Sequence, residues 1–163
     1  MSNAVLISIH PKWCELIASG EKTIEVRKTR PKIKTPFKCY IYCTKFHHGD
    51  PDSMINLKGR TSFFMPKSGK VIGEFVCDEV KRIDIPFPAY WPDLDKSVLD
   101  GTCLSLTEIH DYLGHRSGYG WHISDLKVYE EPKPLKQFQI PTTFPARRVR
   151  QAPQSWCYIE EVE

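Results

Sequence analysis

Three charged side chains that could act on a ligand lie close together near the start of the chain, in the stretch "SGEKTIEVRK". Lys22 precedes a segment in which Glu25 and Arg27 alternate with apolar residues, so these two side chains share one face of a predicted strand, ~7 Å apart at Cα. A carboxylate can accept a hydrogen bond from the exocyclic amine of a base or from an amide, and a guanidinium can hold a phosphate or carboxylate with two hydrogen bonds. A desolvated Lys22 could also serve as a base or a nucleophile.

The alternative interpretation of the same stretch is an exposed strand of mixed charge. Most charged residues of a protein are exposed, and an ion pair on an exposed face contributes little to stability. Spacing alone favours this alternative over a binding site.

Other side chains are candidates for the wall of the same site. Ser8 and His10 share a face of the first predicted strand, although a serine and a histidine by themselves are weak evidence for nucleophilic catalysis. Trp13, Trp121 and His122 could stack on a base. The alternative for each of these three is a place in the hydrophobic core, where tryptophan is often buried.

A basic segment, "ARRVRQ", lies just before the predicted last strand. Its arginines Arg147, Arg148 and Arg150 could contact phosphates at the rim of a cleft, or could belong to a solvated connection. Cations near the other end of the chain could extend this surface: Lys12, Lys28, Arg30, Lys32 and Lys34.

Cysteine and histidine at short spacing raise the question of a metal site at Cys39, Cys43, His47 and His48. In a continuous strand the two cysteines would lie ~13 Å apart, too far to share one ion. We therefore predict two buried thiols, no metal and no cofactor.

The elements that must position these residues can be predicted from periodicity. A first strand at 4–10 leads into a short helix, with Pro11 at the first helical position and Gly20 just past the end. A second helix is predicted at 105–114, with Ser105 or Thr107 as its N-cap and Gly114 as its terminator. Further strands are predicted at 22–28, 38–44, 70–85 with a bend at Gly73, 121–129 and 156–162. Residues 46–68 are predicted to form a long loop that could act as a lid.

Composition and length agree with one globular domain spanning 1–163. The 163 residues include 40% hydrophobic and 26% charged residues. Short strands, few helices and 13 prolines predict a mainly β (α+β) fold, a small closed or partly closed β-barrel of five to six strands with two or more short helices.

Charge and cysteine usage bear on partners and location. The formal net charge of +3 permits a polyanionic partner without requiring one. Six scattered cysteines, no CxxC and no secretory signal suit a cytoplasmic protein. Apolar runs are too short for a membrane span, so we expect no membrane association.

The quoted stretch resembles the signature of the ASCH domain family, G-x-K-x-x-E-x-R at the end of the first helix. Here it is matched by Gly20, Lys22, Glu25 and Arg27. The segments "GYGWHISDLKVY" and "APQSWCYIE" are similar to further segments of bacterial and phage members. The resemblance implies a PUA-like β-barrel whose cleft, beside the first helix, recognises RNA or a nucleotide.

The resemblance also implies a hydrolase alternative. One subgroup hydrolyses N4-acylated cytidines with a Lys, a Thr and a Glu, and other members are ribonucleases. Lys22 matches the subgroup, but the position of its Thr holds Glu25, and Thr23 lies too early. Glu108 is a candidate for the catalytic Glu. We therefore expect an RNA-binding or nucleotide-binding domain, with an amidohydrolase or a ribonuclease as the alternative.

A third hypothesis is a non-enzymatic structural protein in which Glu25 and Arg27 form only a buried pair. Protein partners remain open.

Overall fold

One mixed six-stranded sheet forms the framework of the computed structural model, which describes residues 3–47, 67–84, 94–114, 116–141, 145 and 147–162. Its spatial order is β2-β5-β4-β3-β1-β8. The strands are β1 (Asn3–Ile9), β2 (Ile24–Arg27), β3 (Phe37–Cys43), β4 (Lys70–Ile83), β5 (Gly118–Lys133) and β8 (Trp156–Glu160). Only β1 and β3 pair in parallel among these neighbours. The predicted mainly β class is confirmed.

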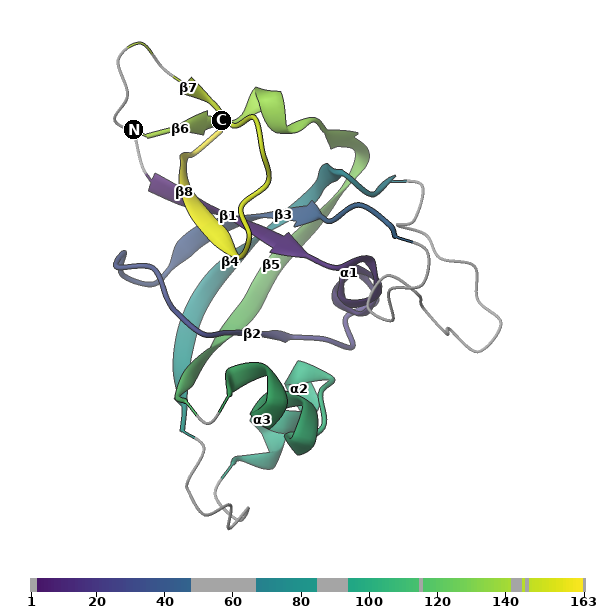
Figure 1. The fold of residues 1–163 in the computed structure, drawn as a ribbon, viewed down its shortest axis with the longest axis vertical. Coiled ribbons are helices and arrows are strands. Elements are labelled where there is room, and N and C mark those ends of the chain that lie inside the picture. Colours follow the sequence, from purple (N-terminus) through teal and green to yellow (C-terminus); the bar gives the residue numbers. More distant parts are fainter. Residues whose placement is uncertain are drawn as a thin grey trace.

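The sheet curves strongly but does not close into a barrel, so that part of the prediction was wrong. The pairing order leaves β2 and β8 as the two edges. Curvature comes from β4 and β5, the long strands that cross the molecule in Figure 1, whose pairing register shifts in three places. One shift lies at Gly73, where the predicted bend occurs, and a Cβ there would come within 2.5 Å of the Lys127 carbonyl oxygen.

Three short helices accompany the sheet in the described part of the chain. The first, α1 (Pro11–Ala18), starts with proline at N1 as predicted, and Gly20 follows its end with φ of +80°. The second, α2 (Lys96–Thr102), was not predicted. The third, α3 (Leu106–Leu113), confirms the predicted helix, because Ser105 and Glu108 form a capping box and Gly114 is the C-cap.

The remaining short elements were also missed by the sequence patterns. They are the 3₁₀ turn η2 (Leu135–Gln137) and the two-stranded ribbon of β6 (Gln139–Ile140) and β7 (Arg147–Arg148). Of the loop predicted at 46–68, residues 48–66 lie outside the described residues, and so does His48. Within the described residues, the structure contains no helix with the length and apolar character of a membrane span.

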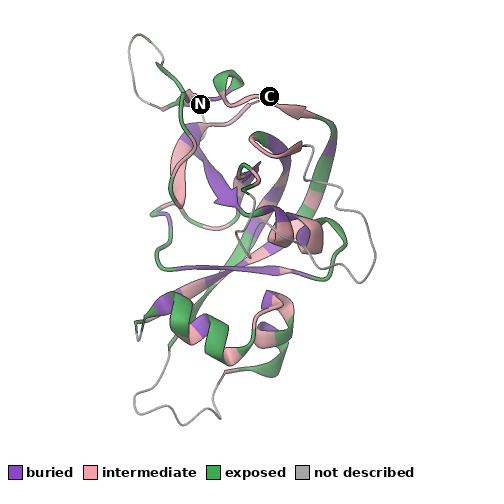
Figure 2. Ribbon diagram, turned by 45° about the vertical axis from the view of Figure 1, so that its right-hand side comes forward, coloured by how far each residue is buried: buried purple, intermediate pink, exposed green. Residues whose placement is uncertain are grey.

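Hydrophobic side chains pack on both sides of the central strands, which Figure 2 shows as mostly buried. Along β1, Val5, Ile7 and Ile9 belong to one core cluster, and Ala4 and Leu6 belong to another. The first cluster lies toward α1, where it also buries Cys14 and Ile17. Cys39 and Cys43 are buried free thiols, as predicted. A third, smaller cluster joins β2 to α3 through Val26, Ile109 and Leu113. The two clusters toward α1 and α3 thus fix the elements that surround the candidate site.

Candidate functional site

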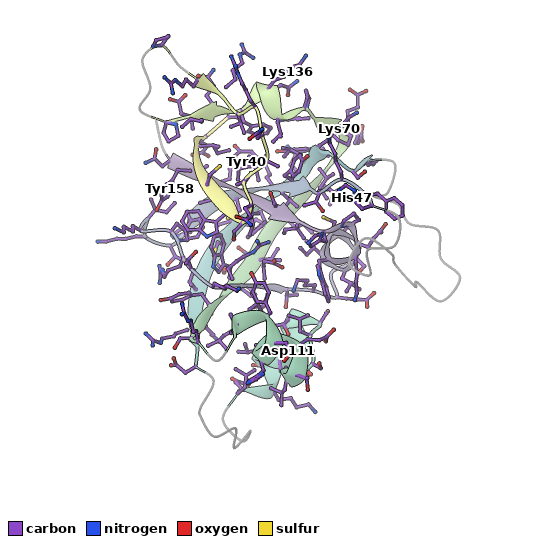
Figure 3. All side chains as sticks on the ribbon, in the orientation of Figure 1. Tyr40, His47, Lys70, Asp111, Lys136 and Tyr158 are labelled. Carbon is purple, nitrogen blue, oxygen red and sulfur yellow. The ribbon has the colours of Figure 1, made fainter. Side chains whose placement is uncertain are left out.

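A pocket of about 700 Å³ opens between α1, β2, α3 and the segment that precedes β8. This volume lies within the range of small-molecule sites in proteins. Figure 3 shows side chains from α1, β2 and α3 gathered in this region, with Asp111 labelled on α3 and His47 beyond α1. Seven residues named from the sequence line it: Ser8, His10, Trp13, Lys22, Glu25, Arg27 and Glu108.

The local fold of β2 turns the charged side chains toward this pocket. Ile24 lies against Gly101 of α2, and Val26 packs in the cluster with α3, so these two side chains occupy the helix side of the strand. Because side chains alternate along a strand, Glu25 and Arg27 must point to the opposite side. All four residues of β2 are buried (Figure 2). The interpretation of this stretch as an exposed strand is therefore wrong.

Lys22, Glu25 and Arg27 form one buried charge cluster, which we call the triad. Their exposed fractions are 2%, 6% and 7%. The Glu25 carboxylate lies between two cations, with Oε1 2.8 Å from Arg27 Nη2 and Oε2 3.3 Å from Lys22 Nζ. Two positive charges thus face one negative charge in a water-poor wall of the pocket.

Arg27 connects three separate parts of the chain. Its Nε and Nη2 donate to Glu25 Oε1, and Nη2 also donates to the carbonyl oxygen of Ser8 at 2.6 Å. Its Nη1 donates to Ser155 Oγ at 3.2 Å, just before β8. The guanidinium therefore spans the opening between edge strand β2 and the pair β1 and β8, where strand pairing stops.

Lys22 is held just as firmly. Its Nζ donates to the carbonyl oxygens of Ile24 at 2.9 Å and Thr102 at 2.7 Å, in addition to its ion pair with Glu25. Two carbonyl oxygens thus accept hydrogen bonds from the ammonium group, and the Glu25 carboxylate balances its charge. This geometry suits a fixed positive charge better than a base or nucleophile.

One polar atom of the triad lacks a hydrogen bond. Glu25 Oε2 is buried, and its contact with Lys22 is an ion pair outside hydrogen-bond geometry, so within the described structure it accepts no hydrogen bond. Buried polar atoms without a partner are rare in proteins and each calls for an explanation. Glu25 lines the pocket, so a ligand N–H group that reached this oxygen after a small movement of the side chain would supply the missing donor.

The other polar candidates already have partners. Ser8 Oγ donates to the carbonyl oxygen of Pro153 at 2.6 Å, and His10 Nδ1 lies 3.1 Å from Thr44 Oγ1, so the two residues do not form a nucleophile and base pair. Glu108 Oε2 accepts from the backbone N–H of Ser105 at 2.7 Å. One carboxylate oxygen of Glu108 is therefore occupied in capping α3.

Two of the aromatic residues that line the pocket, Trp13 and Tyr112, differ in how many cations lie near the ring. The Trp13 ring has Lys12 Nζ 4.5 Å and Lys22 Nζ 5.2 Å from its centroid, so cations already occupy its surroundings. Tyr112 on α3 is 40% exposed, and Lys28 Nζ lies 5.3 Å from its ring. Desolvation by burial raises the pKa of Tyr112, which keeps its hydroxyl protonated at neutral pH.

Five predicted site residues lie outside the pocket lining. Trp121 is fully buried in the core between Phe37 and Trp156, where it cannot stack on a ligand. The ring of His122 is directed to Asp78, with Nδ1 2.6 Å from Oδ1. The arginines predicted to bind phosphate lie at or beside the β6–β7 ribbon, at the end of the molecule opposite α2 and α3 in Figure 1: Arg147, Arg148 and Arg150.

The pocket also contains residues that the sequence patterns did not identify. Among them are Thr44, Lys45, His47, Asp111 and Tyr112, together with the segment 152–155. Tyr112 had a usable signal, because it is a large aromatic residue beside the apolar stripe of a predicted helix. Asp111 lies on the same helix, whereas the others follow β3 or precede β8, and only the tertiary fold brings them to this pocket.

Comparisons with known proteins place this geometry in a family context. A model of the ASCH domain matches residues 7–93, a range that includes the triad. A crystal structure of ASCH from Zymomonas mobilis is 22% identical over 97% of this chain and 88% of that chain, with a TM-score of 0.64.

Crystal structures of two variants of the Zymomonas mobilis protein are similar as well. A serine-to-alanine variant is 21% identical over 97% of this chain and 89% of that chain, with a TM-score of 0.64. A tyrosine-to-phenylalanine variant is 19% identical over 97% and 91%, with a TM-score of 0.61. At these identities the likeness concerns the fold. A search of curated protein sequences found no match.

Proposed function

This chain belongs to the ASCH domain family, and from that premise we propose that its pocket binds a base of RNA or of a free nucleotide. The family resemblance implies RNA or nucleotide recognition in a cleft beside the first helix. The pocket described above lies at that place, between α1, β2 and α3, and its volume suits a ligand of this size.

The observation that carries the proposal is the Glu25 carboxylate in the pocket lining, whose Oε2 forms an ion pair with Lys22 but accepts no hydrogen bond. A buried carboxylate oxygen without a donor is costly, and the exocyclic amine of a base would supply an N–H group to it. Tyr112, exposed at the mouth of the pocket, offers a ring on which such a base can stack. Arg27 and Lys22 direct their donors to protein oxygens, so they support Glu25 rather than contact the phosphate directly.

The hydrolase alternative has less support from this geometry. Lys22 donates to two carbonyl oxygens and forms an ion pair with Glu25, and Glu108 caps α3 with one of its oxygens. Neither residue is placed as a free base for an amide or a phosphodiester. Turnover of N4-acetylcytidine or cleavage of RNA by the purified protein, abolished in Lys22→Ala, would favour the alternative.

The test uses pairs of nucleotides in which the base carries either an exocyclic amine or a carbonyl oxygen at the same position. We expect CMP to bind more tightly than UMP, and AMP more tightly than IMP, by at least about tenfold, because uracil and hypoxanthine carry a carbonyl oxygen where the amine would donate to Glu25. Isothermal titration calorimetry measures the four dissociation constants. Glu25→Gln places an amide where the carboxylate was, and it should remove or reverse the preference.

A second variant protects the test against misfolding of the buried substitution. Tyr112→Ala changes an exposed side chain, so it should fold normally and weaken the binding of all four nucleotides by about fivefold or more, because the base loses its stacking partner. Val128→Ala, which changes a similarly exposed residue outside the pocket lining, is the matched control and should bind like the unmodified protein. Absence of binding of all four nucleotides at millimolar concentration would refute the proposed function.

A further inference from the structure

A loop with four exposed cations connects β2 to β3. Lys28, Arg30, Lys32 and Lys34 alternate with other residues along it, and we call these four residues the basic loop. No ion pair with a carboxylate is formed by any of the four within the described structure. Their four charges exceed the formal net charge of the whole chain, which is +3. The positive excess of the protein is therefore concentrated on this loop.

The backbone of the loop is fixed to the body of the protein. Pro31 is buried, and Ile33 packs against the largest core cluster. The backbone N–H of Lys32 donates to the hydroxyl of Tyr158 at 2.7 Å, and Trp156 Nε1 donates to Thr29 Oγ1 at 3.0 Å. The cations are thus carried on an anchored backbone, so a ligand that binds them has little backbone entropy to overcome.

The basic loop begins at the mouth of the pocket. Arg27, which lines the pocket, is followed directly by Lys28, and Lys28 Nζ lies 5.3 Å from the ring of Tyr112 on the opposite wall. From there the loop runs outward beside β8, as Figure 1 shows at the end of β2, and Tyr158 of β8 lies next to it in Figure 3. Pocket and basic loop therefore form one continuous surface.

We propose that the basic loop holds the phosphodiester backbone of single-stranded RNA as it leaves the pocket. The ligand would then be an RNA chain with one base in the pocket, rather than a free mononucleotide. This inference rests on the proposed function of the pocket. Lysine and arginine neutralise phosphates, and the half-buried aromatic residues Trp156 and Tyr158 beside the loop suit bases better than the carboxylates of an acidic protein.

The experiment measures binding of a fluorescein-labelled ten-nucleotide RNA of mixed sequence by fluorescence anisotropy at several salt concentrations. The test variant replaces all four cations of the basic loop by glutamine. Each phosphate of a single strand that the protein no longer neutralises reduces the slope of log K against log salt by about 0.7, so the variant should lower the slope by about 2 to 3. Affinity at low salt should fall at least about thirtyfold, while CMP should still bind, because none of the four residues lines the pocket.

A control variant removes the same number of charges elsewhere. It replaces four exposed lysines outside the pocket and the basic loop by glutamine: Lys81, Lys96, Lys127 and Lys136. This control should keep the RNA affinity within about threefold. Equal decreases in the two variants would mean that the basic loop has no special role and would refute the inference.

The outcomes separate this inference from the proposed function. RNA binding that is unchanged in the basic-loop variant, with CMP still bound in the pocket, would refute only the proposal that the basic loop holds the RNA backbone. Failure of CMP and the other three nucleotides to bind the unmodified protein would refute the proposed function, and with it this inference. Polyglutamate can also be added as a competitor of the labelled RNA. If it competes as strongly as unlabelled RNA at equal charge, the partner is an acidic protein, and the proposal that the basic loop holds RNA is refuted.

Discussion

One carboxylate, that of Glu25, holds two cations in the wall of the pocket. Burying three charges is costly, and such clusters often contribute less to stability than hydrophobic packing would. Removal of one member is a different matter, because it leaves the remaining groups without their partners. Arg27 has the most to lose, since it bonds to Glu25, Ser8 and Ser155 at once.

We expect Arg27→Ala to lower the free energy of unfolding by about 3–5 kcal/mol, because it leaves buried acceptors on β1 and β2 without a donor. Urea denaturation followed by circular dichroism measures this change. Arg82→Ala is the matched control, because Arg82 pairs with Asp84 on the exposed surface and its removal should hardly move the midpoint. Equal shifts in the two variants would contradict a structural role of Arg27.

A buried thiol gives a prediction about pH. Burial raises the pKa of Cys77 from its usual 9.0 to about 12. The unfolded chain releases this proton at lower pH than the folded protein, so the stability from this thiol is complete below pH 9 and is lost as the pH rises toward 12. Between pH 9 and pH 10 the loss should be about 1 kcal/mol.

Denaturation curves at pH 9 and pH 10 test this expectation. Cys77→Ala should show a decrease in stability between the two pH values that is smaller by about 1 kcal/mol than in the unmodified protein. The cavity that the substitution creates lowers stability equally at both pH values, so it does not affect the difference between them. Identical slopes in both proteins would show that Cys77 ionises alike in the folded and unfolded states.

The sequence placed two members of the triad on one strand face, but it did not predict their burial or their partners. Alternation along β2 was enough to place Glu25 and Arg27 on one face. It could not show that Lys22 would bond to the carbonyl oxygen of Thr102, because that contact joins residues 80 positions apart. For the same reason alternation could not decide that Trp121 belongs to the core rather than to the pocket.

At the scale of elements, local signals succeeded where one turn or cap specifies the structure. The helix at α3 was predicted from Ser105 and Gly114, which act on their immediate neighbours. The ribbon of β6 and β7 has only two residues per strand and too little periodicity to recognise. Helix α2 is seven residues long and contains a glycine, so its pattern was equally weak.

The pairing of β4 with β5 depends on Gly73. A Cβ at this position would meet the Lys127 carbonyl oxygen at 2.5 Å, and backbone atoms cannot move aside as a flexible side chain can. We expect Gly73→Ala to lower the free energy of unfolding by about 1–3 kcal/mol. Thermal and urea denaturation measure the change.

Gly20→Ala is the comparison for this prediction. A Cβ added at Gly20 would meet no other atom, so this substitution is unfavourable only because of the positive φ, which costs about 1–2 kcal/mol. The two substitutions should therefore differ in kind: Gly73→Ala should also alter the near-ultraviolet spectrum of Trp121, which lies on β5, and Gly20→Ala should not. A stable Gly73→Ala protein with an unchanged spectrum would contradict the close approach.

At the scale of the whole molecule, the prediction of a barrel failed for a definite reason. Composition and strand number agree with a barrel, but closure needs a hydrogen-bonded ladder between the first and last strands of the sheet. Here β2 and β8 do not pair, and the side chain of Arg27 bridges the opening instead. Strand patterns carry no information about such a side-chain link.

That bridge has a consequence for how a ligand can be found. Arg27, which bridges the opening between the sheet edges, also bonds to Glu25. The same contacts therefore hold the fold together and position the carboxylate of the pocket. A compound that binds only the folded protein adds about 2.7 kcal/mol of stability at a concentration one hundred times its dissociation constant. A ligand of the pocket should therefore raise the melting temperature of this protein. Nucleosides and oligonucleotides can be ranked by this increase, without any assumption about a reaction.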